Sequence, residues 1–494
     1  MKKTAFLLLL LLCGITLHAQ TETDTTAVFK KRVLETTEVD LLSSYYKQEG
    51  IHSAVGGGLG TEELTDATGD IIVAIPLNDD DVLTVNAGFS AYTSASSSNI
   101  NPFFTDGTYT NNTGASNGRY ANPSVRRDDD DDDYGEASPA PYGSPWIEST
   151  GASRKDVLVM LNAQYSHSSD DRNTIWDVHA SGSTEYDYQS FGFGAGIAKL
   201  FNEKNTEVSI KASAYLDKWK PIYPTELHEF AKYGTRFLNS GYFDGITIYD
   251  QNGEESSNYF PSSFTEFDSK KRNSYSVSFG FSQVLTRRLQ LSLFFDVLYQ
   301  EGLLSTPYHR MYFADKANYY IGQARYIPIY DTAGNKGIFR LADDVERLPG
   351  TRFKLPLGAR LNYYLNDFMV LRTYYRFYTD DWGLHSHTAS IEVPVKLNRS
   401  FTIYPMYRFY TQNAARYFAP QDRHYSFEEY YTSDYDLSAF DSHQYGGGIT
   451  YTDMFQGFRL LSLGLKTIDF RYNHYERSDS LEADIFTIGI KFTH

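Results

Sequence analysis

The sequence predicts an all-β protein, a transmembrane antiparallel up-and-down β-barrel of about sixteen strands with short periplasmic turns and long extracellular loops. Three observations predict this fold. An export signal opens the chain. After it, apolar and polar residues alternate over stretches of about ten residues, which is the period of a β-strand. Tight polar turns also alternate along the chain with much longer connections, which is typical of outer-membrane barrels.

The export signal covers residues 1–19. Two lysines precede the apolar run Ala5–Leu12, and the small residue Ala19 stands where a signal peptidase would cut. The only cysteine, Cys13, lies inside this signal, so the exported chain has no disulfide and no thiolate chemistry. We expect residues 20–37 to form a periplasmic N-terminal segment that is available to periplasmic partners.

Composition excludes two other classes of protein. The formal net charge of the 494 residues is −17, whereas a nucleic-acid-binding protein needs an excess of Lys and Arg to neutralise phosphates. After the signal, no apolar run approaches the roughly 20 residues that a transmembrane helix needs. A helical membrane protein is therefore not expected.

The barrel is expected over residues 38–494, with a first strand near 38–48 and a last one at 481–492. Between these, alternation is clearest at 82–92, 208–216, 274–282, 289–297, 353–363 and 391–397. One parity in each stretch is apolar, so we expect it to face lipid while the other parity faces the interior.

The connections predict which end of the barrel faces the cell surface. Short polar turns occur near 78–81, 170–173, 202–205, 286–288, 366–367 and 398–400. Long loops, expected outside the cell, occur at 97–154, 217–273, 301–351 and 412–442. A secreted soluble β-protein is the alternative, but its strands would be shorter, about five or six residues, and its loops would not sort by end.

The interior parity is basic along four consecutive strands. We call these six residues the basic wall: Lys354, Arg360, Arg372, Arg376, Lys396 and Arg408. Only Glu392 interrupts them. Such a wall would attract anionic solutes. The other interpretation, which we favour from the sequence, is that carboxylates from folded-in loops pair with these cations and fill the lumen.

The sequence contains two candidates for metal binding. The longest loop carries the six adjacent carboxylates Asp128, Asp129, Asp130, Asp131, Asp132 and Asp133, which could collect a hard divalent cation through oxygen ligands. Runs of like charge are more often solvated. His385 and His387 would share one face of a strand, but no third ligand follows nearby.

No catalytic motif is present, and we expect no enzymatic activity. There is no nucleophile elbow, phosphate-binding glycine loop or His-Glu-x-x-His sequence. His167 with Ser166 or Ser168 could begin a hydrolase site, but no third partner is placed beside it.

Several segments resemble a known family. These are the block Gly60–Phe103, the turn at 165–173 and the stretch from LFNEKNTE to the WKPIYP segment at 219–224. They are similar to a domain-of-unknown-function family of exported Gram-negative proteins that are expected to be outer-membrane β-barrels. The resemblance implies the fold and the outer-membrane location, and it transfers no activity.

The same resemblance suggests an envelope redox context, because family members are often encoded near a periplasmic flavin transferase and a thioredoxin-like protein. The segment Thr150–Ser153 is similar to the acceptor motif on which such transferases place FMN, which makes Ser153 the candidate attachment residue. Ile147 occupies the upstream acidic position of that motif, and Glu148 follows one place late.

The sequence thus predicts a pore, a transport protein or an envelope scaffold in contact with outer-membrane lipid, with a preference for anions as a finer hypothesis. A redox-associated barrel that carries covalent FMN or a metal is the alternative within the membrane. No other cofactor and no oligomeric state are indicated.

Overall fold

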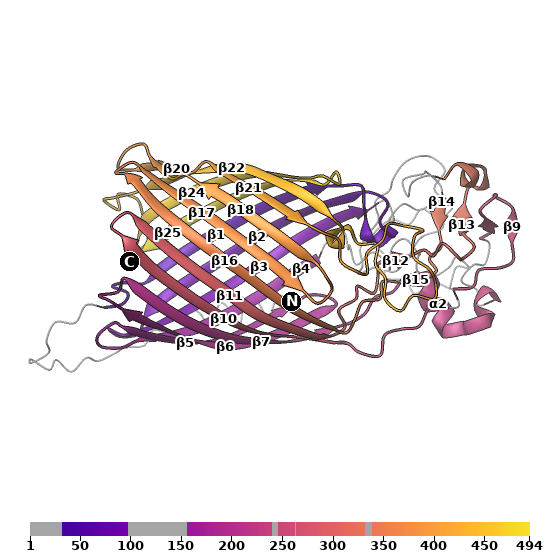
Figure 1. The fold of residues 1–494 in the computed structure, drawn as a ribbon, viewed down its shortest axis with the longest axis horizontal. Helices are drawn as coiled ribbons and strands as arrows, with labels where there is room; N and C mark the ends of the chain where they lie inside the picture. Colours follow the sequence, from indigo (N-terminus) through magenta and orange to yellow (C-terminus); the bar gives the residue numbers. More distant parts are fainter. Residues whose placement is uncertain (1–31, 97–155, 240–245, 262, 331–337) are drawn as a thin grey trace, which may run out of the picture.

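The computed structural model describes residues 32–96, 156–239, 246–261, 263–330 and 338–494. It consists of a long β-barrel with a second folded body at one end (Figure 1). In the described part of the chain, no helix has the length and apolar character to cross a bilayer.

The barrel is closed and has sixteen antiparallel strands, which confirms the predicted fold and strand number. In order around the ring they are β1 (Glu38–Glu49), β2 (Glu62–Pro76), β3 (Asp81–Ser96), β4 (Asp156–Ser168), β5 (Thr174–Thr184), β6 (Tyr188–Phe201), β7 (Thr206–Trp219), β10 (Lys271–Thr286), β11 (Leu289–Gly302), β16 (Thr351–Asn366), β17 (Met369–Asp380), β18 (His385–Glu392) continued by β19 (Val395–Lys396), β21 (Met406–Gln412) continued by β20 (Phe401–Ile403), β22 (Phe440–Thr452), β24 (Leu463–Arg477) and β25 (Glu482–Thr493). The ring closes where β1 pairs with β25, from Glu38 opposite Thr493 to Glu49 opposite Glu482. Closure leaves no unpaired sheet edge, as a barrel in lipid requires.

Two strands of the ring are interrupted, and proline explains both breaks. Pro394 separates β18 from β19, and Pro405 separates β20 from β21. Because proline has no N–H, it cannot donate to a ladder. The prolyl carbonyls still accept hydrogen bonds from the neighbouring segment of the sheet: Pro394 O accepts from Val370 N at 3.2 Å, and Pro405 O accepts from Val393 N at 3.0 Å.

Alternation along the strands has the predicted result for the outer wall. Large apolar side chains on the outward parity are about half exposed, among them Ile71 at 52%, Val159 at 51% and Phe191 at 54%. A soluble protein rarely exposes so extended an apolar surface. An outer-membrane barrel must do so, because lipid is the solvent of that face. The secreted soluble alternative is therefore wrong.

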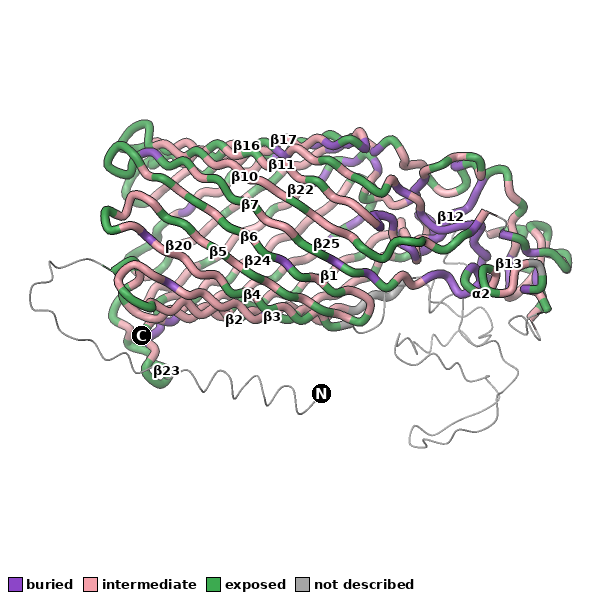
Figure 2. Tube along the Cα trace, turned by 90° about the horizontal axis from the view of Figure 1, so that it is seen from below, coloured by how far each residue is buried: buried purple, intermediate pink, exposed green. Residues whose placement is uncertain are grey.

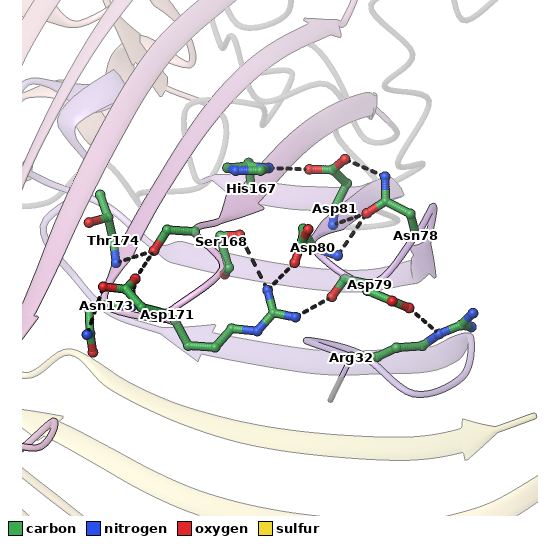
Figure 3. A network of polar contacts seen from close by, with 12 residues as sticks. Arg32, Asn78, Asp79, Asp80, Asp81, His167, Ser168, Asp171, Asn173 and Thr174 are labelled. Atoms are coloured by element: carbon green, nitrogen blue, oxygen red, sulfur yellow. Dashed lines mark hydrogen bonds and ion pairs between the residues drawn. The ribbon is translucent and has the colours of Figure 1, made fainter. Parts of the chain in front are cut away.

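The polar turns join strands at the end opposite the folded body. Arg172, in the β4–β5 turn, donates to Asp80 Oδ1 at 2.5 Å and to the Asp79 carbonyl at 2.8 Å in the β2–β3 turn. Arg32 donates to Asp79 Oδ1 at 2.8 Å, which holds the last residues before β1 against the same turn (Figure 3). Adjacent turns are thus fastened together at the periplasmic rim.

The connections at the other end form a folded cap, which the sequence analysis did not predict. Its elements are α2 (Thr225–Tyr233), the sheet of β8 (Ile248–Asp250), β9 (Glu255–Ser256), β13 (Tyr319–Gly322) and β14 (Ile338–Arg340), the pair β12 (Arg310–Met311) and β15 (Asp344–Val345), and 3₁₀ turns at η1 (Ala54–Gly56), η3 (Gly234–Asn239), η4 (Ala324–Ile329) and η5 (Tyr435–Leu437). One further short strand, β23 (Arg459–Leu460), pairs with β24 at the periplasmic end.

The cap has apolar cores of its own. One packs Phe237, Ile248 and Tyr259 against residues of β13 and β14, and another packs Leu227 of α2 against Val345 of β15. Figure 2 shows that the buried residues gather in the cap and where it meets the barrel. The cap is therefore a folded body, because non-local apolar burial offsets the entropy of ordering long loops.

A glycine marks the point where the barrel gives way to the cap. Gly302 ends β11 with φ of +109°, and a Cβ there would lie 1.9 Å from the Lys271 carbonyl oxygen. Only glycine fits this position, because the backbones approach too closely for a side chain. The chain then continues with Leu303 N donating to the same carbonyl at 2.8 Å.

Candidate functional site in the barrel lumen

The inner face of the barrel is identified by a contact that spans several strands. Glu392 on β18 accepts from Arg372 Nη1 on β17 at 2.9 Å and from Arg471 Nη1 on β24 at 3.1 Å. Because β21 and β22 lie between β18 and β24, these side chains meet across the concave side of the wall. Residues that share their parity therefore line the lumen.

The structure places the basic wall on four neighbouring ring positions. Lys354 and Arg360 lie on β16, Arg372 and Arg376 on β17, Lys396 on β19 and Arg408 on β21. Arg360 and Arg408 share one row of the ladder, with Tyr374 and Ser390 between them. Arg360 also lies over the rings of Phe294 and Tyr374, at 5.4 and 5.5 Å from their centroids, which holds its guanidinium group at the wall.

Charge neutralisation along the basic wall is incomplete among the described residues. Arg372 is the one member with an ion pair there, and its partner Glu392 belongs to a barrel strand and not to a loop. Arg376 and Arg408 flank β18 opposite Thr388 and Ser390, which are small and uncharged. This geometry favours cations that are available to solutes over cations that are neutralised by loops.

The wall on the other side of the lumen is acidic. Asp66 and Asp70 lie on the inward parity of β2, which is half-way round the ring from β16. Asp66 accepts hydrogen bonds from Ser90 Oγ at 2.7 Å and Thr68 Oγ1 at 3.1 Å, and within the described ranges neither aspartate has a cationic partner. Opposite charges on facing walls produce a field across the lumen.

The sequence analysis did not identify these aspartates. The signal was present, since Asp66, Thr68 and Asp70 recur at the strand period.

The cap is fastened to the extracellular rim of the barrel. Arg352 Nε of β16 donates to Asp380 Oδ2 of β17 at 2.9 Å, and its guanidinium group lies 4.1 Å from the ring centroid of Trp382. Trp382 in turn packs against Leu304 and Leu348, which are the residues through which the chain enters and leaves the cap. The cap therefore has a fixed position over the mouth (Figure 1).

Buried charges hold the centre of the cap. Arg310 Nε donates to Glu226 Oε1 at 3.0 Å, and both side chains are fully buried. Nearby, Asp343 accepts from Phe313 N at 2.9 Å. Burial raises the pKa of Asp343 to about 7, although the Phe313 N–H favours the charged carboxylate.

The remaining sequence candidates do not assemble into sites. His385 and His387 lie on the outward face, and His387 Nδ1 is 2.8 Å from the Tyr375 hydroxyl. His167 pairs with Asp81 at 2.6 Å, while Ser166 Oγ turns to the Val82 carbonyl. Among the residues that the structure describes, neither group has the further partner that its chemistry requires.

Two candidates lie outside the described residues. These are Ser153 and the acidic run Asp128–Asp133, both of which fall in the segment 97–155. FMN attachment at Ser153 and divalent-cation binding by the acidic run stay predictions.

Comparison with known proteins places this chain in a family. The model of a family described as "Protein of unknown function (DUF3570)" matches residues 7–487. No curated protein sequence matches the chain.

Several solved outer-membrane proteins align with most of the chain at low sequence identity. A bacterial polysaccharide outer membrane secretin is 8% identical, with a TM-score of 0.39 over 93% of this chain and 98% of that one. The outer membrane protein OpdK from Pseudomonas aeruginosa is 7% identical, with a TM-score of 0.34 over 93% and 99%. A BenF-like porin from Pseudomonas fluorescens Pf-5 is 8% identical, with a TM-score of 0.35 over 93% and 98%.

Proposed function

The chain belongs to the DUF3570 family of proteins of unknown function, and we propose that it conducts small anionic solutes across the outer membrane through the lumen of its barrel. The observation that carries the proposal is the pair of oppositely charged walls. Arginines of β16 and β17 lie across the ring from Asp66 and Asp70 of β2, and Arg408 of β21 extends the basic wall. Such a field orients and attracts anions.

Transport of this kind needs no catalytic group. The barrel would supply a polar path through the hydrocarbon, and the basic wall would raise the local concentration of anions along it. The cap stands over the extracellular mouth, so solutes would enter past its surface. The cap would thereby act as the first selectivity element and the basic wall as the second.

Removing two charges from the basic wall should reduce anion selectivity. We expect the Arg372→Ala, Arg376→Ala double variant to shift the reversal potential toward cations in planar bilayers under a salt gradient. Most of the shift should come from Arg376, because Arg372 is already paired with Glu392. The complementary variant Asp66→Asn, Asp70→Asn should shift the reversal potential toward anions.

A matched control removes two arginines elsewhere. Arg287→Ala with Arg288→Ala changes the net charge equally but lies in the β10–β11 turn outside the basic wall. This control should leave the selectivity close to that of the wild type. The proposal fails if the variant of the basic wall and the turn control give the same reversal potential. It also fails if the inserted wild-type protein passes no current.

A further inference from the structure

Three metal-ligand side chains converge in the cap, away from the lumen. They are His309, Glu346 and Asp434, whose ligand atoms all lie within 4.8 Å of one another. We infer that these residues bind one divalent first-row transition-metal ion, with Zn²⁺ as the best match, and that the ion joins two segments of the cap.

Backbone pairing holds the three residues in register. His309 and Glu346 adjoin the β12–β15 pair, and Glu346 N donates to the His309 carbonyl at 2.9 Å. Arg347 and Tyr431 exchange two backbone hydrogen bonds, of 3.0 and 2.7 Å, which bring the third segment alongside. Asp434 then stands at the N-cap of η5. The ligands are thus positioned by hydrogen-bonded backbone, as a preorganised site requires.

The spacing is too long for hydrogen bonds and suits an ion. His309 Nδ1 lies 3.5 Å from Glu346 Oε2 and 3.9 Å from Asp434 Oδ2. Tetrahedral ligands at about 2.0–2.1 Å from zinc are roughly 3.3 Å apart, so a small inward shift would complete the coordination. His309 Nδ1 is also buried without a hydrogen-bond partner. Such a buried nitrogen is destabilising unless it binds a ligand such as a metal ion.

The carboxylates are oriented by neighbours in the way that metal ligands are. Glu346 Oε1 accepts from Thr306 N at 2.7 Å, and Oε2 accepts from Thr432 Oγ1 at 2.5 Å. The same Thr432 hydroxyl accepts from Asp434 N at 3.0 Å, so one side chain links two of the ligands. Hydrogen bonds of this kind fix the direction of ligand lone pairs.

The donor set selects the class of metal. One imidazole nitrogen and two carboxylate oxygens suit Zn²⁺ and its neighbours, whereas Ca²⁺ and Mg²⁺ prefer oxygen ligands alone. The two carboxylates also supply the negative charge that balances a divalent cation.

The bound ion would act as a staple for the cap. His309 and Glu346 belong to the connection between β11 and β16, and Asp434 belongs to the connection between β21 and β22. Because binding requires the folded arrangement, its free energy would stabilise the cap against local opening.

Direct metal titration tests the inference. The full-length protein, folded in detergent and stripped with a chelator, would be titrated with Zn²⁺ by calorimetry and with Co²⁺ by visible absorption. We expect one saturable site per chain, a Co²⁺ spectrum typical of tetrahedral nitrogen and oxygen ligands, and slower proteolysis of the cap when Zn²⁺ is bound.

The decisive variant is Glu346→Gln, which loses the anionic ligand. Its amide oxygen can still accept from Thr306 N, and its NH2 group can donate to the Thr432 hydroxyl in place of the bond that the carboxylate accepted. It should weaken Zn²⁺ binding at least tenfold, and Asp434→Asn, which retains an N-cap oxygen, should do the same. The matched control is His228→Asn. His228 pairs with Glu266 at 2.8 Å on the cap surface, outside the three-residue cluster.

Replacing the six aspartates 128–133 by asparagine tests whether Zn²⁺ binds to the acidic run and not to the three-residue cluster. We expect this variant to keep the Zn²⁺ affinity of the wild type. Two results would overturn the inference. One is a wild-type protein without a saturable Zn²⁺ site. The other is that the six-asparagine variant no longer binds Zn²⁺, while the folded Glu346→Gln variant binds it as tightly as the wild type.

Discussion

At the scale of single residues, burial decides which charges matter. In the cap, Arg310 and Glu226 are fully buried and paired, and a break in such a pair costs about 3–5 kcal/mol. On the barrel surface, Lys47 and Glu49 form an exposed pair, which water and salt screen. The buried pair therefore matters more to stability than the exposed one.

Asp343 makes the stability of the cap depend on pH. Its pKa is raised from 3.8 to about 7 by burial, so the folded cap holds a proton that the unfolded chain releases. Its contribution is complete below pH of about 4 and is lost as the pH rises through about 7. The slope is at most about 1.4 kcal/mol per pH unit.

Asp343→Asn should remove this part of the pH dependence, because an amide oxygen still accepts from Phe313 N. We expect the variant cap to be more stable than the wild type at pH 8 and similar at pH 4. Hydrogen exchange of cap amides, corrected for the intrinsic rate at each pH, measures the difference. Parallel pH profiles for both proteins would contradict this assignment.

At the scale of elements, the strands could be predicted from the sequence and the cap could not. A strand in a barrel wall meets only two environments, lipid and lumen, so its period of two is visible locally. The cap depends on contacts between distant segments, such as Phe237 with Ile321 and Leu341. No local pattern records such pairings. The His309, Glu346 and Asp434 cluster was missed for the same reason.

Adjacent positions on β11 provide a test of strand orientation. Leu293 faces outward and is 44% exposed, whereas Ser292 hydrogen-bonds Ser282 at 3.0 Å on the inner face. We expect Leu293→Lys to destabilise the barrel by about 2–4 kcal/mol, because a lysine there would face hydrocarbon.

Ser292→Lys should have a much smaller effect, since its amine would enter the lumen. Urea-dependent unfolding from lipid vesicles measures both variants. Equal destabilisation by the two substitutions would show that β11 does not alternate between lipid and lumen.

At the scale of the whole molecule, the protein combines a membrane-embedded barrel with a cap that has its own apolar cores. The barrel exposes its apolar residues to lipid and turns charges inward, whereas the cap buries apolar residues in water-excluding cores (Figure 2). The sequence predicted the barrel and its basic wall. It did not reveal the facing acidic wall, because the relation between β2 and β16 exists only once the ring has closed.

The most direct measurement uses single cysteines on β17 in a Cys13→Ser background, which contains no other thiol. In proteoliposomes, a charged, membrane-impermeant thiol reagent should label Arg376→Cys, which faces the lumen, and should leave Tyr375→Cys, which faces lipid, unlabelled. Equal labelling of the two positions, or labelling of Tyr375→Cys alone, would contradict the account.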